Sequence, residues 1–220
     1  MRHTKRPWSN VNGKVGDAMT AHSASAHQAA TEQAIKPLWQ YLLALGAEPE
    51  RLAPLLTHAR ALSYQPSECL LPQGEHQTFA YFVVDGIVRA CHYTQEGSER
   101  CKEFYFEGEL CFLYSSWLKQ DVAPYQLETV GACRLVQIPL AVLNEPFMQQ
   151  VQLALLKQQL LYKEQKEAFL LLNTPEQRYL HLLEYFPLWV ERLTHAQLAN
   201  YIGITAISLS RIRKRLQDSP

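Results

Sequence analysis

The middle of the chain alternates between short apolar runs and glycines, whereas both flanks carry apolar residues at helical spacing. Between Leu62 and Ile138 the runs FAYFVV, IVRACHY, CKEFYF and ACRLVQI have the length of β-strands. The glycines between them recur at intervals of 12, 11 and 11 residues, at Gly74, Gly86, Gly97 and Gly108. This is the rhythm of short strands joined by turns. It predicts a compact antiparallel β-roll of the double-stranded β-helix type, within an α+β fold.

One hairpin of this β-roll is expected around Glu96 and Gly97, because strand-like runs flank both sides. The hairpin would bring Cys91 and Cys101 close together on neighbouring strands. Buried thiols commonly behave as small apolar side chains. We interpret both as packing residues, with redox sensing as the alternative.

The segment before the β-roll is predicted to contain short helices. Residues 35–58 repeat leucines at helical spacing and are interrupted by Gly46 and Pro49. Residues 1–33 have no sustained period and are expected to form a flexible N-terminal arm. The predicted domains are the β-roll at 34–144, a long helix at 145–173 and a C-terminal domain at 174–220.

The long helix carries two apolar stripes. A spacing of three and four residues, as in coiled coils, predicts a dimer seam along one side. The seam consists of Phe147, Val151, Ala154, Gln158, Leu161, Gln165, Ala168 and Leu172. Leu153, Leu156 and Leu160 form the second stripe, which is expected to pack on the β-roll. The alternative is an ordinary buried helix within a monomer.

The C-terminal domain opens with helix-start signals. The sequence TPEQ at 174–177 combines an N-cap threonine, a proline at the first helical position and a glutamine that can close a capping box. Thr194 with Gln197 repeats this logic, and Thr205 with Ser208 offers a weaker version. Three helices are therefore expected to begin at these positions.

The last two of these helices fit a helix-turn-helix. Helices that cross over a short turn need a small residue at their contact and a residue tolerant of left-handed backbone in the turn. Ala199 and Gly203 supply them. The apolar residues that would lock the helices together are Leu198, Ile202, Leu209 and Ile212. An amphipathic helical hairpin with a solvated basic face is the alternative.

Charge is balanced over the whole chain but not at its end. The 21 Lys and Arg residues match 21 Asp and Glu residues. Residues 206–217, however, contain four cations and no acid. Such a local patch can bind phosphates even on a neutral molecule.

Cysteine usage and hydropathy indicate a cytoplasmic protein. The five cysteines stand singly, without the CxxC pairs of zinc or iron–sulfur sites, at Cys69, Cys91, Cys101, Cys111 and Cys133. No apolar run is long enough to cross a membrane, and polar residues follow the basic N-terminus. We expect no metal and no membrane partner.

The order of β-roll, long helix and terminal helix-turn-helix resembles the Crp/Fnr family of bacterial transcription regulators. The resemblance spans residues 34–216. Its carriers are YFVVDGIVR (81–89), FEGELC (106–111), NTPEQRYLHLL (173–183) and LANYIGIT..SLSRIRKRL. It implies a homodimer that reads a palindromic site in double-stranded DNA and contacts RNA polymerase, and no enzymatic activity.

The resemblance also assigns DNA contacts to the last helix. The residues implied are Thr205, Ala206, Ile207, Ser208, Ser210, Arg211, Arg213, Lys214 and Arg215. The family commonly has an acidic residue where this chain has Ile207. A C-terminal wing is expected to be small or absent, unless residues 189–192 supply one.

The nucleotide pocket departs from the family pattern. Gly108-Glu109-Leu110 remains, but the Arg-Ser pair that holds a cyclic phosphate falls on Ala123-Pro124, and a polar pair of the long helix falls on Leu161-Tyr162. A buried phosphate without a cationic partner is unfavourable. Cyclic AMP is therefore not expected to bind, and the effector, if one exists, is unidentified. The pocket residues implied are Glu109, Leu110, Ala123, Pro124, Tyr125, Leu161 and Tyr162.

Other classes fit the sequence less well. An iron–sulfur sensor of this family needs N-terminal cysteines, and residues 1–68 have none. A haem-based regulator could use His58, His76 or His92, and remains an alternative. A cupin-like β-barrel enzyme needs an HxH metal motif, which residues 62–138 lack. A constitutive DNA-binding protein with a vestigial pocket is the third alternative.

Overall fold

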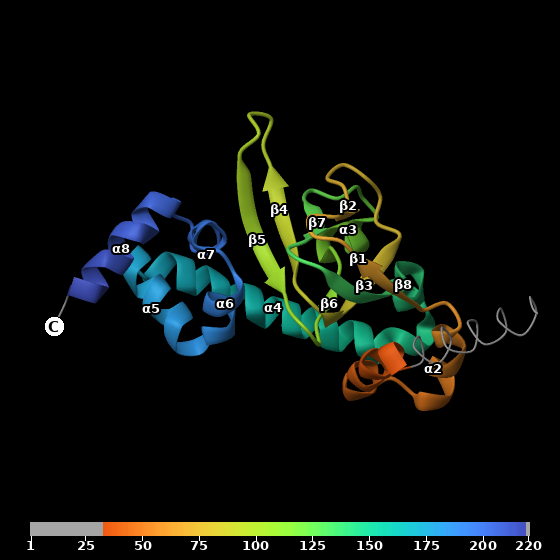
Figure 1. Cartoon of the computed structure of the whole chain (residues 1–220). Coiled ribbons are helices and arrows are strands. Elements are labelled where there is room, and N and C mark those ends of the chain that lie inside the picture. Colours follow the sequence, from red (N-terminus) through yellow and green to blue (C-terminus); the bar gives the residue numbers. More distant parts are fainter. Residues whose placement is uncertain (1–32, 219–220) are drawn as a thin grey trace, which may run out of the picture.

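The computed structural model describes residues 33–218 and shows a β-roll, a long helix running along it and a helical domain at the far end of that helix (Figure 1). The predicted arm, residues 1–33, lies outside this range except for Gln33. Residues 33–44 are helical and are followed by α2 (Pro49–Leu56), which confirms the short helices predicted there. None of the described helices is long and apolar enough to cross a membrane.

The described residues between 60 and 139 form two antiparallel sheets. Their strands are β1 (Arg60–Tyr64), β2 (Cys69–Leu71), β3 (Phe79–Asp85), β4 (Val88–Tyr93), β5 (Glu99–Tyr105), β6 (Leu110–Cys111), β7 (Gln126–Thr129) and β8 (Cys133–Pro139). The strand orders are β1-β8-β3-β6 and β2-β7-β4-β5. The short helix α3 (Tyr114–Lys119) connects β6 to β7. The predicted β-roll is confirmed.

Alternation along the strands separates two apolar cores. On β3, Tyr81 and Val83 face the interior between the sheets, whereas Ala80 and Phe82 face the helices outside. This two-residue period is what a strand buried on both faces requires. Cys91 lies opposite Cys101 on the β4–β5 hairpin, as predicted.

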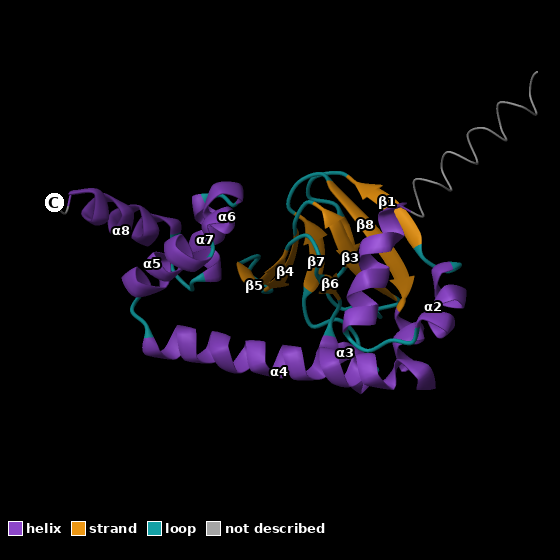
Figure 2. Cartoon of the chain, turned by 90° about the horizontal axis from the view of Figure 1, so that it is seen from below, coloured by secondary structure: helices purple, strands orange, loops and turns teal. Residues whose placement is uncertain are grey.

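The long helix α4 (Gln149–Leu172) follows two short 3-10 turns, η1 (Leu140–Asn144) and η2 (Pro146–Met148). Its first turns pack with the N-terminal helix against the sheet that contains β3, where Val151 and Leu155 are fully buried. Beyond the β-roll, α4 continues to the helical domain (Figure 2).

This packing corrects part of the predicted seam. Val151 belongs to the protomer core, and Phe147 lies in η2, before α4 begins. The second stripe is also wrong, because Leu153 and Leu160 are exposed and only Leu156 packs partly against the core. The other seam residues are partly or largely accessible at Ala154, Gln158, Leu161, Gln165, Ala168 and Leu172.

The described part of the helical domain consists of four helices. They are α5 (Pro175–Tyr185), α6 (Pro187–Arg192), α7 (His195–Tyr201) and α8 (Ala206–Asp218). Thr174 and Thr194 both close capping boxes, and Thr205 accepts a hydrogen bond from the Ser208 N–H at 3.1 Å. All three predicted helix starts are confirmed. Residues 189–192 lie in α6, so the possibility of a wing built from them is wrong.

The helices α7 and α8 have the predicted helix-turn-helix geometry. Gly203 has φ +76°, the left-handed conformation that the turn requires. Ala199 is buried at the crossing, and the four predicted apolar residues form the core beneath it. The tight turn and the apolar lock together fix α8 against α7.

Arg178 of α5 ties this motif to the long helix. Its guanidinium donates to the carbonyls of Leu170 at 2.6 Å, Asn173 at 3.0 Å and Ile202 at 2.8 Å. The first two carbonyls belong to the end of α4 and its cap, and the third to the helix-turn-helix. Hydrogen bonds from a charged group are stronger than neutral ones. One side chain therefore holds three segments together.

Candidate DNA-binding surface and interdomain cleft

The exposed face of α8 is formed by the side chains that point away from its contact with α7. Leu209 and Ile212 are buried, so Ala206, Ser210 and Arg211 on the opposite face are exposed. Ile207 is 67% exposed on the same face. Next to this face, Thr205 caps the N-terminus of α8 by accepting the Ser208 N–H.

The cations of α8 differ in how free they are. Arg213 donates to His195 Nδ1 at 2.8 Å, and Arg215 pairs with Glu176 at 2.8 Å. Arg211 and Lys214 have no hydrogen bond or ion pair within residues 33–218 and project into solvent. These two are the cations most available to a nucleic acid.

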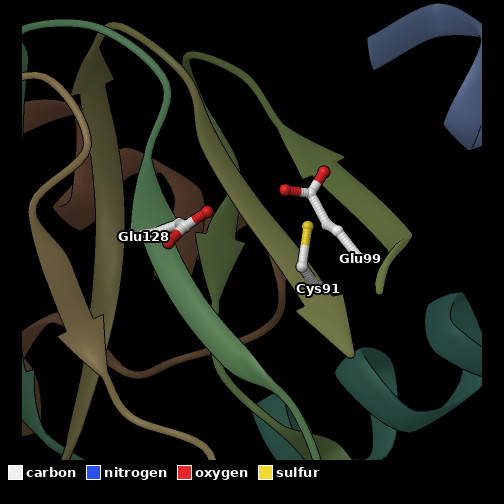
Figure 3. Close-up of side chains that lie close together, drawn as sticks. All are labelled: Cys91, Glu99 and Glu128. Carbon is white, nitrogen blue, oxygen red and sulfur yellow. The ribbon is translucent and has the colours of Figure 1, made fainter. Parts of the chain in front are cut away.

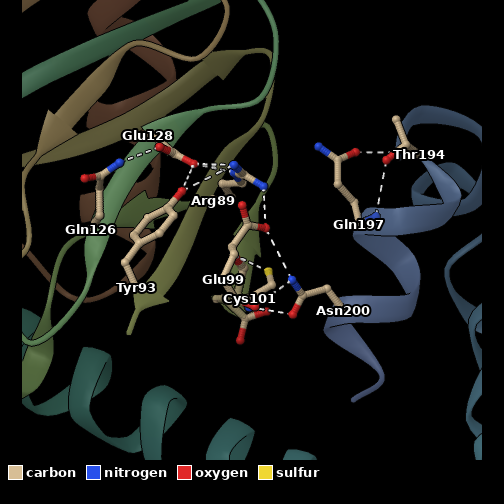
Figure 4. Close-up of polar contacts among 10 residues, drawn as sticks. Arg89, Tyr93, Glu99, Cys101, Gln126, Glu128, Thr194, Gln197 and Asn200 are labelled. Carbon is tan, nitrogen blue, oxygen red and sulfur yellow. Dashed lines mark hydrogen bonds and ion pairs between the residues drawn. The ribbon is translucent and has the colours of Figure 1, made fainter. Parts of the chain in front are cut away.

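The β4–β5 hairpin contacts α7 through Asn200 (Figure 4). Asn200 accepts a hydrogen bond from the Cys101 N–H at 2.8 Å and donates to the Glu99 carbonyl at 3.2 Å. Because β5 is the edge strand of its sheet, these contacts satisfy backbone groups that would otherwise be unpaired. Arg89 extends the network by pairing with Glu99 at 2.8 Å and Glu128 at 2.5 Å.

A cleft of about 440 Å³ lies between the β-roll, α4 and the helical domain. Its walls include three residues of the predicted pocket, Glu109, Leu110 and Tyr162. The remaining lining residues are Tyr41, Glu103, Phe104, Tyr105, Gly108, Tyr114, Gln158, Gln159, Lys163, Gln165, Phe186, Trp189 and Tyr201. Leu161, Ala123, Pro124 and Tyr125 are not part of this wall. The structure thus separates the predicted pocket into two groups.

Two carboxylates of the cleft have different surroundings. Glu103 is 5% exposed, accepts a hydrogen bond from Tyr162 and pairs with Lys166 at 3.2 Å. Glu109 accepts only the Phe106 N–H, at 2.5 Å, and has no cation beside it in the described residues. Glu109 lines the cleft and is exposed, and partial desolvation of its carboxyl group raises its pKa to about 7. Burial also raises the pKa of Tyr162.

Comparison with known proteins shows which fold this chain has. Residues 61–150 match the model of the cyclic nucleotide-binding domain family. FixK2 from Bradyrhizobium japonicum superposes with a TM-score of 0.62 at 18% identity, over 73% of this chain and 85% of that protein. CLP, the c-di-GMP responsive global regulator of Xanthomonas campestris, superposes with a TM-score of 0.61 at 20% identity, over 78% of this chain and 92% of that one. The chain has the Crp/Fnr fold. No curated protein matches its sequence.

Within this Crp/Fnr fold, the segment expected to hold a cyclic phosphate offers no donor. The Ala123 N–H donates to the Glu75 carbonyl at 2.8 Å, and Pro124 has no N–H. The Pro124 carbonyl is itself bonded to His92 Nδ1 at 3.0 Å. Tyr125 is buried in the apolar interior of the roll. These residues are structural parts of the roll.

Cys91, Glu99 and Glu128 are the described residues most similar to a metal site (Figure 3). Their ligand atoms lie within 4.8 Å of one another. Arg89, however, donates to both carboxylates, so its guanidinium already neutralises the pair. A divalent cation would have to displace a partly buried arginine, and we interpret the group as a structural ion-pair network.

Sequence reasoning missed the aromatic residues of the cleft that come from outside the β-roll. Tyr41 lies on the N-terminal helix, and Trp189 and Tyr201 lie in the helical domain. The density of aromatics around β5 was a signal, but aromatic packing in a core gives the same signal. Only the folded chain brings these segments together.

Proposed function

We propose that this protein is a dimeric transcription regulator that binds double-stranded DNA by placing α8 in the major groove. The observation that carries the proposal is the exposed face of α8, with Arg211 unpaired on it and the apolar lock behind it. Arginine can donate two hydrogen bonds to guanine O6 and N7, the commonest specific contact of such helices. Lys214 follows on the same helix toward the phosphate backbone.

The second copy is proposed to pack along the exposed part of the seam, from Gln158 to Leu172. Leu161 is 63% exposed and lies in the middle of this stretch. Glutamines at Gln158 and Gln165 would set the register of two parallel helices, as polar seam residues do. A two-fold dimer would match a palindromic site, and RNA polymerase is the further partner that this function implies.

We propose that no cyclic nucleotide is the effector of this protein, because Ala123 and Pro124 offer neither a cation nor a free N–H to a phosphate. The roles left for the chain are those of a regulator without enzymatic activity. CLP, to which the chain is similar in fold, is described as a global regulator.

Selection of binding sites from random duplex DNA tests the proposal. The expected result is an enriched palindrome with half-sites one helical turn apart, bound with an affinity that falls steeply with salt. Failure to enrich any sequence, together with binding that does not depend on salt, would exclude DNA recognition by this chain.

A further inference from the structure

The interdomain cleft has the size and composition of a small-molecule site. Its volume of about 440 Å³ falls within the range of roughly 300 to 1,000 Å³ that ligand pockets occupy. Its walls come from the N-terminal helix, β5 and the turn after it, β6, the start of α3, the middle of α4, and the helical domain. A ligand there would touch the β-roll and the helical domain at once.

The wall supplied by the helical domain is a continuous set of aromatic rings. Trp189 stacks with one face on Phe106 of the β-roll, which is not among the lining residues, with ring centroids 5.0 Å apart and planes 12° apart. It also contacts Tyr201 and Phe186, each at 5.0 Å between centroids. Tyr41 and Tyr114 lie on the β-roll side. Such surfaces favour flat aromatic ligands, which bury a large apolar area and stack in offset or edge-on geometry.

The charges of the cleft disfavour a charged ligand of either sign. Lys163 of the cleft wall lies 4.9 Å from the centroid of the Tyr162 ring, and Lys166, which lies outside the lining, is 4.0 Å from that of Tyr201. Cations therefore already occupy two aromatic faces, and a cationic ligand would be repelled. An anionic ligand would meet Glu103 and Glu109.

Glu109 supplies the one polar preference. Its carboxylate accepts the Phe106 N–H and has further acceptor positions with no donor among the described residues. An acceptor in partly desolvated surroundings gains from a donor that the ligand brings. Glu103, by contrast, is already satisfied by Tyr162 and Lys166.

We propose that this cleft binds a neutral, flat aromatic molecule without phosphate, whose hydroxyl group donates to Glu109 while its rings pack between Tyr162 and the Trp189 side of the helical domain. The site differs from a cyclic-nucleotide pocket because it does not use Ala123 or Pro124 and because α6 and α7 form one wall. Any effect of this ligand on DNA affinity rests on the proposed function, whereas the binding of the ligand to the cleft does not.

Calorimetry without DNA at pH 8, above the raised pKa of Glu109, tests the site with two probes, 2-naphthol and 2-methoxynaphthalene. They share the ring system, and only the first can donate a hydrogen bond. With the wild-type protein, 2-naphthol is expected to bind with a dissociation constant below about 1 mM and roughly tenfold more tightly than the methyl ether, the difference that one hydrogen bond to a charged group supplies.

Two variants, each with a matched control variant, locate the binding. In Glu109→Leu the two probes should bind equally, while Glu164→Leu on the exposed side of α4 should keep the tenfold difference. Gln159→Trp should fill the cleft and abolish binding of both probes, while Lys157→Trp, outside the cleft on the same helix, should not. Far-ultraviolet circular dichroism confirms that each variant is folded.

The proposal is overturned if 2-naphthol does not bind, if the methyl ether binds as tightly to the wild type, or if Lys157→Trp abolishes binding as fully as Gln159→Trp. Because no DNA is present, these outcomes are distinct from a failure of DNA recognition. A protein that binds the probe but no DNA would retain the site and lose the proposed function.

Discussion

Arg192 and Glu107 form a bidentate ion pair in which both guanidinium–carboxylate distances are 2.7 Å. Arg192 ends α6 of the helical domain, and Glu107 follows β5 of the β-roll. Glu107 also accepts the Gly86 N–H at 2.9 Å, which orients its carboxylate. The pair therefore joins the two domains at a point where the geometry is fixed on both sides.

This pair predicts a stability change at low pH. Hydrogen bonding to Arg192 lowers the pKa of Glu107 to about 2 from an ordinary value of 4.5. A lowered pKa in the folded state means that the stabilisation is present above pH 4.5 and is lost as the pH falls toward 2. Both side chains are about one-third exposed, so the effect is small.

The measurement is thermal unfolding of the wild type and Glu107→Gln between pH 7 and 2. The wild type should melt at a higher temperature at neutral pH, and the difference should shrink and vanish near the lowest pH. Glu191→Gln, on an exposed neighbour of Arg192, controls for the loss of one negative charge. A difference that stays constant down to pH 2 would contradict the assignment.

The proposed dimer seam predicts that Leu161→Glu produces monomers. The substitution places two carboxylates face to face in the seam, and burying unpaired charges is unfavourable by several kcal/mol, on the order of 3 to 5. Sedimentation velocity at low micromolar concentration reports the mass. Leu118→Glu on α3, where the leucine is 60% exposed, is the matched control and should remain dimeric. A dimeric Leu161→Glu protein would show that the seam is not the interface.

The recognition helix predicts different consequences for its two unpaired cations. Arg211→Ala should cost about 1 to 3 kcal/mol per specific contact and relax the preference for guanine at one position of the half-site. Lys214→Ala should weaken binding to all sequences alike and reduce the salt dependence by about one unit. Site selection with wild type and both variants distinguishes them. An unchanged motif for Arg211→Ala, or a rewritten one for Lys214→Ala, would reverse the roles.

Ile207 predicts a departure in the half-site itself. The side chain is exposed and cannot accept a hydrogen bond from a cytosine amino group. The base pair that faces it should be read by apolar contact with a thymine methyl group or not be read at all. In the selection experiment, Ile207→Glu should introduce a preference for cytosine there. No change of preference in that variant would mean that Ile207 does not reach a base edge.

The segment Ala123-Pro124, which stands where a cyclic phosphate would be held, predicts negligible binding of cyclic AMP and cyclic GMP. Ala123 uses its N–H within the roll, and Pro124 has none to offer. Calorimetry with each nucleotide should give no measurable heat at concentrations up to about 100 µM, whereas an affinity of about 1 µM for either would refute the interpretation of the pocket.

Local signals in the sequence predicted those parts of the fold that depend on neighbours in the chain. The capping boxes at Thr174 and Thr194 and the left-handed turn at Gly203 are such features, because a few adjacent residues determine each of them. The strand period of the β-roll belongs to the same class. The face on which α4 packs does not.

The packed face of α4 could not be predicted because polar side chains form much of it. Tyr162 and Lys166 continue the face begun by Val151 and Leu155, with their polar ends on Glu103. A pattern of apolar positions counts such residues as solvent-facing and moves the expected core to the leucines around them. The contacts of Asn200 with β5 were likewise hidden, since they join residues a hundred positions apart.

The three hydrogen bonds of Arg178 mean that the length of α4 sets the orientation of the helix-turn-helix. Because the end of α4 is bonded to the helix-turn-helix, every residue inserted into the exposed half of α4 would rotate the helix-turn-helix by about 100° and move it by about 1.5 Å along the helix axis. In a parallel two-fold dimer both helix-turn-helix units would turn in the same sense about their own α4 helices, so the two recognition helices would no longer face adjacent major grooves together. Insertions should therefore be tolerated only near whole helical turns, which restore the orientation of both recognition helices.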